Sequence, residues 1–132
     1  SALVRDAFVG QAALQIARKN FAEASETLAN ARTILKEFPP NGSQLFYEGL
    51  VESGLGRKPE AMARWKQVVD QFPSDAVVPQ ALYYLGRSVI EDKDTGAAVG
   101  YFQRMTKDHP QSTWRNELQL SLVEAMIAGL PA

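Results

Sequence analysis

The chain of 132 residues is 45% hydrophobic and 22% charged, with a formal net charge of −1. This balance is typical of a folded globular protein rather than a disordered one. Nucleic-acid binders usually carry a basic excess that neutralises phosphates, and this chain has none. Its acidic and basic residues alternate, which leaves no polybasic patch for a membrane surface. The absence of cysteine excludes disulfides, thiolate zinc sites and cysteine nucleophiles.

Helical periodicity runs through almost every segment, and good helix formers dominate the composition. Asn41-Gly42 would indicate a hairpin only between strands, so we interpret it as a loop between helices. Pro79 allows the fifth helix to begin near Asp75, with the proline in its first turn, or only at Pro79 itself. We predict seven helices, at about 3–19, 21–37, 43–54, 58–71, 76–92, 95–108 and 113–128.

Two kinds of break separate these helices. Prolines at positions 39–40, 73 and 110 each end a long helix, because proline restricts the preceding residue and cannot donate to the helix ladder. Softer breaks lie at 19–20, 54–56 and 92–94. We expect each soft break to divide a pair of helices and each proline to end the pair. The second helix of the first pair is predicted to run about one turn longer than its counterparts.

An internal repeat of 37 residues relates three copies of this helix pair. In each copy a small residue on the first helix should admit the second helix of the same pair, and a large apolar residue should fill the wedge between them. One pair cannot cover its own apolar face, so the next pair must stack on it. This predicts a core containing Trp65, Phe102, Leu45 and Leu82. The four repeating columns are Ala12, Gly49 and Gly86; Ala24, Ala61 and Ala98; Leu28, Trp65 and Phe102; and Phe8, Leu45 and Leu82.

The repeated pattern resembles the tetratricopeptide repeat, which combines a Leu-Gly pair, an alanine, a bulky aromatic residue and a closing proline. The third copy carries the closest set: Leu82, Leu85, Gly86, Ala98, Phe102 and Pro110. The resemblance implies an all-α fold, an α-solenoid of three antiparallel helix pairs with a C-terminal capping helix at 113–128. It also implies one domain over 1–132, with repeats at about 3–39, 43–73 and 76–110. Because 37 exceeds the usual repeat length of the family, we expect longer loops around 39–43 and 73–79.

The stretch that reads ALYYLG and then GYFQRMTKDHPQS is similar to repeats of a bacterial subgroup found in cell-envelope proteins. This similarity implies a periplasmic or envelope-associated location, slightly favoured over the cytoplasm. The chain opens within a helical pattern and closes on Gly-Leu-Pro-Ala, so we expect a fragment of a longer protein.

The residues that could carry chemistry are better explained by structure. His109 precedes Pro110, where the other copies place Phe38 and Phe72, and it is the only histidine. The acidic group at 91–94 lacks the spacing of a calcium loop. Gly54 to Lys58 lacks the spacing, the Ser/Thr and the preceding strand of a phosphate loop. The sequence therefore predicts no enzyme and no catalytic, cofactor-binding or metal-binding residue.

The resemblance implies that the first helix of each pair lines a concave groove for an extended or helical peptide. Tyr83 and Arg87 are four residues apart, hence on one helix face, and are residue types that anchor interfaces. The alternative is that these two side chains pack against a neighbouring pair or the last helix. By register, the predicted groove comprises Phe46, Leu50, Gln80, Tyr83, Arg87 and Ile90.

The implied function is a non-catalytic scaffold that binds a protein or peptide, with no nucleic-acid partner and no membrane insertion. A structural alternative is self-association, including a homodimer through the apolar C-terminal helix, or docking onto other domains of the same protein. That helix carries Trp114, Leu118, Leu122 and Val123 at helical spacing, with Leu120 and Ile127 on neighbouring faces. A third alternative is a regulatory or substrate-holding part of an enzyme whose active site lies elsewhere.

Overall fold

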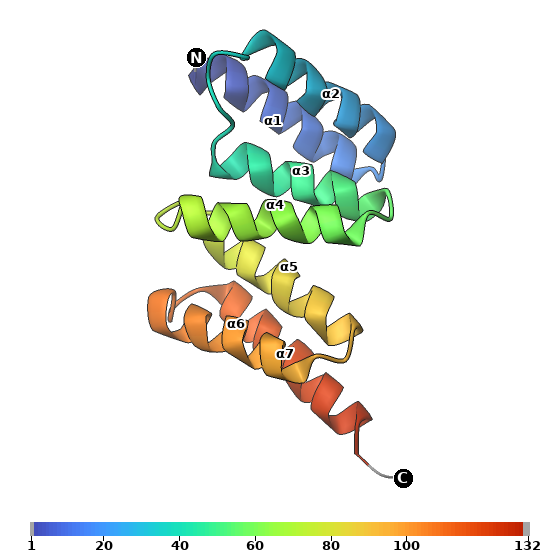
Figure 1. Cartoon of the computed structure of the whole chain (residues 1–132), viewed down its shortest axis with the longest axis vertical. Helices are drawn as coiled ribbons and strands as arrows, with labels where there is room; N and C mark the ends of the chain where they lie inside the picture. The colour runs from blue at the N-terminus through green and yellow to red at the C-terminus, as the bar shows by residue number, and fades with distance from the viewer. Residues whose placement is uncertain (1, 131–132) are drawn as a thin grey trace. The chain divides into compact units, whose positions relative to one another are not determined.

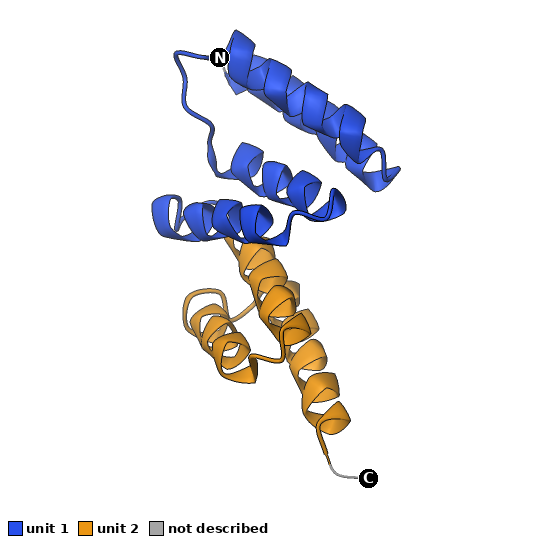
Figure 2. Ribbon diagram, turned by 45° about the vertical axis from the view of Figure 1, so that its right-hand side comes forward, with its two compact units in different colours: residues 1–75 blue, residues 76–132 orange. Residues whose placement is uncertain are grey.

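The computed structural model of the chain describes residues 2–130, which form seven helices and no strand (Figure 1). They fall into two compact units, Ser1–Asp75 and Ala76–Ala132 (Figure 2). Within each unit the helices form antiparallel pairs, the all-α architecture expected of an α-solenoid. The helices are α1 Ala2–Ala17, α2 Phe21–Ile34, α3 Gly42–Gly54, α4 Lys58–Gln71, α5 Val78–Glu91, α6 Thr95–Asp108 and α7 Thr113–Ala128.

The helix boundaries confirm the period of 37 residues. The first helices of the three pairs end at positions 17, 54 and 91, and the second helices begin at 21, 58 and 95. The turns within pairs span only 18–20, 55–57 and 92–94, whereas the segments between pairs span 35–41 and 72–77. The extra length of the repeat therefore lies between the pairs, as predicted.

The turns within the pairs share a backbone feature that the sequence columns did not reveal. Lys19, Gly56 and Lys93 have φ angles of 60°, 78° and 62°, and they too are 37 residues apart. Only the middle copy uses glycine, which adopts this left-handed conformation without steric cost. For the two lysines the left-handed conformation costs roughly 1 kcal/mol each. They adopt it because the three-residue turn requires it.

Two of the proline stops act as predicted. Phe72 and His109 close α4 and α6 with φ angles of −130° and −138°, and each donates its N–H to the carbonyl four residues earlier. These extended φ angles are those expected of residues that precede proline. His109 thus occupies the same helix-terminal position as Phe72, as the repeat predicts.

The predicted extra turn of α2 is wrong. The helix ends at Ile34 and has 14 residues, the same length as α4 and α6. The following residues form a separate turn, in which the Phe38 N–H donates to the Leu35 carbonyl at 2.7 Å. Arg5 then donates from Nη2 to the Phe38 carbonyl at 2.9 Å. The chain can therefore leave the helix before Pro39 because these bonds satisfy its backbone.

Asn41-Gly42 begins a helix rather than forming only a loop. The Asn41 side chain accepts a hydrogen bond from the Gln44 N–H at 2.9 Å, which caps α3, and Gly42 is the first helical residue. Asparagine is among the preferred residues at this position because its side-chain oxygen satisfies an otherwise unpaired donor. Pro79 lies in the first turn of α5, which begins at Val78.

In unit 1 the core lies between the two helix pairs, where Ala12, Ala24, Leu28 and Val51 pack together. Trp65 of α4 is buried beside α3 and donates from Nε1 to the Phe46 carbonyl at 3.3 Å. A Cβ added to Gly49 would lie 2.7 Å from Cδ1 of Trp65 and closer still to its Nε1. Gly49 therefore admits the second helix of its own pair, as predicted.

Unit 2 differs at the corresponding glycine. A Cβ added to Gly86 would lie 2.5 Å from Cδ1 of Leu118, which belongs to α7 and not to α6. The prediction that Gly86 admits its own second helix is therefore wrong, because α7 packs against both α5 and α6 and inserts Leu118 there. Leu118 and Leu122 are buried, which confirms α7 as a cap over the third pair.

The core prediction holds for Trp65, Leu45 and Leu82, which are all buried. Phe102 is only half-buried. Its ring lies under the guanidinium of Arg115 from α7, 5.2 Å from ring centroid to Cζ, and Arg115 also donates from Nε to Thr106 Oγ1 at 3.0 Å. One face of the Phe102 ring is thus covered by a charged side chain rather than by an apolar one, and the ring is not fully buried.

Candidate functional site

Four of the predicted groove residues lie along α5: Gln80, Tyr83, Arg87 and Ile90. Arg87 is exposed and the other three are half-buried. Arg87 donates from Nη1 to Tyr83 Oη at 2.8 Å, and its Cζ lies 5.8 Å from the centroid of the Tyr83 ring. The predicted pairing of these two side chains on one helix face is therefore present. Their hydrogen bond holds the guanidinium over the aromatic ring at the surface of the helix.

Tyr83 also belongs to an aromatic cluster with α7. Its ring centroid lies 5.1 Å from that of Trp114 and 5.2 Å from that of Tyr84. Such tilted and edge-on arrangements add stability beyond the burial of the rings. The cap helix thus covers part of Tyr83, as the packing alternative proposed, whereas Arg87 extends beyond it into solvent. Sequence spacing could not indicate Trp114, because it lies 31 residues away along the chain.

The two predicted groove residues of unit 1 differ in exposure. Leu50 of α3 is half-buried, but only 1% of Phe46 is exposed. The Phe46 ring instead lies edge-on to Tyr47, with 5.2 Å between centroids. The structure therefore removes Phe46 from the set of residues that could contact a ligand at the surface.

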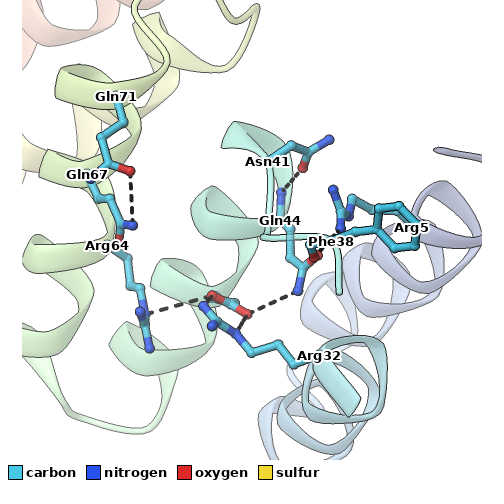
Figure 3. Close-up of polar contacts among 9 residues, drawn as sticks. Arg5, Arg32, Phe38, Asn41, Gln44, Arg64, Gln67 and Gln71 are labelled. Atoms are coloured by element: carbon cyan, nitrogen blue, oxygen red, sulfur yellow. Dashed lines mark hydrogen bonds and ion pairs between the residues drawn. The ribbon is translucent and has the colours of Figure 1, made fainter. Parts of the chain in front are cut away.

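A charged centre in unit 1 was missed at the sequence level (Figure 3). Glu48 of α3 accepts two hydrogen bonds from Arg32 of α2, at 2.7 Å and 2.6 Å, and one from Gln44 Nε2 at 3.3 Å. Arg64 of α4 lies 3.8 Å away from the same carboxylate. One buried acid thus connects three helices of unit 1. We name Arg32, Gln44, Glu48 and Arg64 the Glu48 centre.

The electrostatics of the Glu48 centre are those of a structural ion pair. The hydrogen bond to Glu48 is the main cause that raises the pKa of Arg32 above its ordinary value, although burial opposes it. A hollow of about 150 Å³ lies beside Glu48 and is also lined by Arg32 and Arg64. None of the three charged residues recurs at the interval of 37, since the corresponding residues of the third copy are Leu85, Thr106 and Tyr101. The centre is specific to the second pair and its neighbour.

Comparison with protein families identifies the segment that contains α5 and α6. Residues 80–112 match the model of the tetratricopeptide repeat family. This segment is similar to a tetratricopeptide repeat. Neither a curated protein sequence nor a solved structure matches the chain. Tetratricopeptide repeats generally mediate protein–protein interactions and typically have no catalytic role.

The matched segment, residues 80–112, borders a hollow of about 320 Å³ near the end of α7. Ile90, Lys93 and Thr95 of this segment line one side, and Ala125, Ala128 and Gly129 line the other. Small residues on α7 leave this space open. Ile90, a predicted groove residue, thus lines a hollow in unit 2.

Within residues 2–130, no three His, Cys, Asp or Glu side chains gather in a way that could hold a metal ion. None of the helices in this range has the length and apolar character that crossing a membrane requires.

Proposed function

We propose that the chain is a non-catalytic binding module, and that the face of α5 within the tetratricopeptide repeat contacts a protein or peptide partner. The observation that carries the proposal is the exposed Arg87 guanidinium, held over Tyr83 by a hydrogen bond of 2.8 Å. Gln80 and Ile90 extend this surface in both directions along α5, and both are half-buried. We name these four residues the α5 face.

The chemistry of the α5 face favours a peptide with an acidic residue beside an apolar one. Arginine presents five N–H donors in a fixed fork, of which Nη1 already serves Tyr83. The other donors match the geometry of a carboxylate. Tyr83 is already partly ordered by Trp114, so binding would cost little additional side-chain entropy.

Peptides selected from a random displayed library on the wild-type chain are expected to contain such an acidic residue. Arg87→Glu should weaken the binding of a selected peptide by at least about tenfold, which equals about 1.4 kcal/mol, because it replaces an attractive charge with a repulsive one. Titration calorimetry at fixed ionic strength would measure the loss.

Lys107→Glu provides the matched control, because Lys107 is an exposed base on α6 and the change in net charge is the same. It should leave the affinity within about twofold, since exposed distant charges are screened. Equal binding by the Arg87→Glu variant would refute the role of the α5 face. Tyr83→Ala is a poor test, because it would also remove the contact with Trp114 and so disturb α7.

Self-association through α7 is a second candidate, favoured by an exposed apolar stripe. Leu120, Val123, Ile127 and Leu130 are spaced three or four residues apart, and each is between 45% and 68% exposed. Contiguous apolar surface of this kind is typical of contact sites. We name these residues the α7 stripe, and a homodimer through it is the corresponding proposal.

Sedimentation equilibrium over a hundredfold range of concentration tests the second candidate. The wild-type chain is expected to show a mass that rises with concentration, and Val123→Lys with Ile127→Lys should abolish the rise because it places two charges in the contact. Leu14→Lys, at an exposed leucine of α1, is the control and should leave the rise unchanged. A wild-type mass that stays at that of the monomer would refute the homodimer.

The proposed periplasmic or envelope-associated location rests on the similarity of the third copy to repeats of bacterial envelope proteins, and it stays a prediction.

A further inference from the structure

Arg64 differs from the other members of the Glu48 centre because its side chain forms no hydrogen bond there. Its Nε lies 3.8 Å from Glu48 Oε1, which is beyond hydrogen-bond distance, and no described residue accepts a hydrogen bond from it. Glu48 instead receives the Nε and Nη2 donors of Arg32, so Arg32 Nη1 also has no acceptor among the described residues. Two guanidinium groups, from α2 and α4, therefore converge on one place with N–H donors that remain unused (Figure 3).

Both guanidinium groups border the hollow of about 150 Å³ beside Glu48. Leu28 and Val51 give this hollow an apolar wall, and each of them is only 3% exposed. The Arg32 and Arg64 side chains are 42% and 38% exposed, so the hollow is open to solvent at its charged end. A single water needs only about 10–15 Å³ of such space, which leaves room here for a small organic group.

The charges around the hollow leave one base without an acid of its own. Both oxygens of Glu48 already accept hydrogen bonds from Arg32. Glu52, the other acid that lines the hollow, forms an ion pair with Arg57 at 3.6 Å. Each acid is thus matched by a different arginine, and Arg64 is the base that remains. One negative charge from a ligand would balance the set.

The same charges restrict the class of ligand. An ammonium or guanidinium ligand would meet two like charges, those of Arg32 and Arg64. A phosphate group would bring a charge of about −1.5 to −2, more than the single positive charge that Arg64 leaves. A carboxylate brings one negative charge, and its two oxygens match the planar fork of arginine. Glu60, one turn before Arg64 on α4, does not line the hollow and forms no ion pair with Arg64.

We propose that this hollow binds a carboxylate carried on a short apolar chain. The carboxylate oxygens accept hydrogen bonds from Arg64 and from Arg32 Nη1, while the apolar chain lies against Leu28 and Val51. Glu48 keeps its structural role, because it holds the Arg32 guanidinium in place and does not contact the ligand's charge directly. The site lies wholly in unit 1 and does not depend on the α5 face.

Butyrate and butyramide test the site, because they have the same number of non-hydrogen atoms and differ in charge. In a titration of the ¹⁵N-labelled chain, butyrate is expected to shift the Arg64 Nε–H resonance and the Val51 backbone resonance in a saturable way. It should bind at least about fivefold more tightly than butyramide, because hydrogen bonds from arginine to an ionised acceptor are stronger than those to a neutral one. This preference should fall as the ionic strength rises, since both arginines are partly exposed.

Arg64→Gln removes the unmatched charge without breaking a hydrogen bond of the folded chain, so it should fold and lose the preference for butyrate. Lys66→Gln is the matched control, because Lys66 is an exposed base on the same helix and the change in net charge is the same. It should keep the preference within about twofold, since exposed charges are screened. Equal affinities of the wild-type chain for the two compounds, or an undiminished preference in Arg64→Gln, would overturn the proposal. The comparison on the wild-type chain decides the matter even if Arg64→Gln does not fold.

A free small acid and the glutamate side chain of a partner protein offer the same carboxylate chemistry. Glutamate with both backbone ends blocked as amides separates these two sources. Binding as tight as that of butyrate would identify a partner's glutamate as the occupant, whereas weaker binding would identify a free acid. Arg87→Glu should leave all these affinities unchanged, which separates this site from the α5 face.

Discussion

Replacement of Gly49 by alanine is expected to destabilise unit 1 by about 2 kcal/mol, although alanine is the better helix former by about 1 kcal/mol. The new methyl group would overlap the indole of Trp65, with 2.7 Å to Cδ1 and 2.9 Å to Cε2. The indole is rigid and only 1% exposed, so it cannot turn away without loss of packing. Its hydrogen bond to the Phe46 carbonyl would also be strained or lost. The steric cost therefore exceeds the gain in helix propensity.

The two tryptophans of the chain make this change measurable in one unit alone, because Trp65 lies in unit 1 and Trp114 in unit 2. In a Trp114→Phe background, fluorescence during unfolding in guanidinium chloride reports only on Trp65. The midpoint should move to lower denaturant concentration with little change in slope, since the area exposed on unfolding is nearly the same.

Gly10→Ala is the matched control. Gly10 is exposed in the interior of α1, also in unit 1, and an added Cβ would meet no atom within 4 Å. This substitution should stabilise unit 1 by about 0.5–1 kcal/mol, because only the propensity changes. If Gly49→Ala proved as stable as Gly10→Ala, the close packing of Trp65 on α3 would be wrong.

Removal of the acid in the Glu48 centre should cost about 2–3 kcal/mol of unfolding free energy. Glu48→Ala would leave the Gln44 amide with neither of its polar atoms paired, and Gln44 is only 1% exposed. It would also break both hydrogen bonds from Arg32. The Arg32 side chain is 42% exposed, so water can recover part of its loss, which keeps the effect below that of a fully buried ion pair.

Denaturant unfolding in the same Trp114→Phe background would measure this effect, with Glu52→Ala as the control. Glu52 is on the same helix and forms an ion pair with Arg57 at 3.6 Å, but the Arg57 side chain is 57% exposed and that of Glu52 is 22% exposed, against 10% for Glu48. Its removal should change stability by no more than about 0.5 kcal/mol. Equal effects of the two substitutions would mean that the Glu48 centre contributes no more than a surface ion pair.

The helix pairs and their period could be predicted because they depend on local features. Prolines stop α4 and α6 through the geometry of the residue before them, and that geometry needs no tertiary contact. The turns at Lys19, Gly56 and Lys93 follow the same interval. The end of α2 was the exception, because the turn at Leu35–Phe38 is completed by a contact with Arg5 from another helix.

In the candidate sites, too, some features could be predicted from the sequence and others depend on tertiary contacts. The sequence by itself determined that Tyr83 and Arg87 share one face of α5, since helical spacing decides that. Only the tertiary structure decided that Trp114 covers Tyr83 while Arg87 stays exposed, and that Leu118 rather than α6 fills the space over Gly86. It also brought Arg32, Glu48 and Arg64 together from three helices. Periodicity shows which face of a helix is apolar, but not which of several apolar helices will pack on it. That choice depends on contacts between residues far apart in the chain.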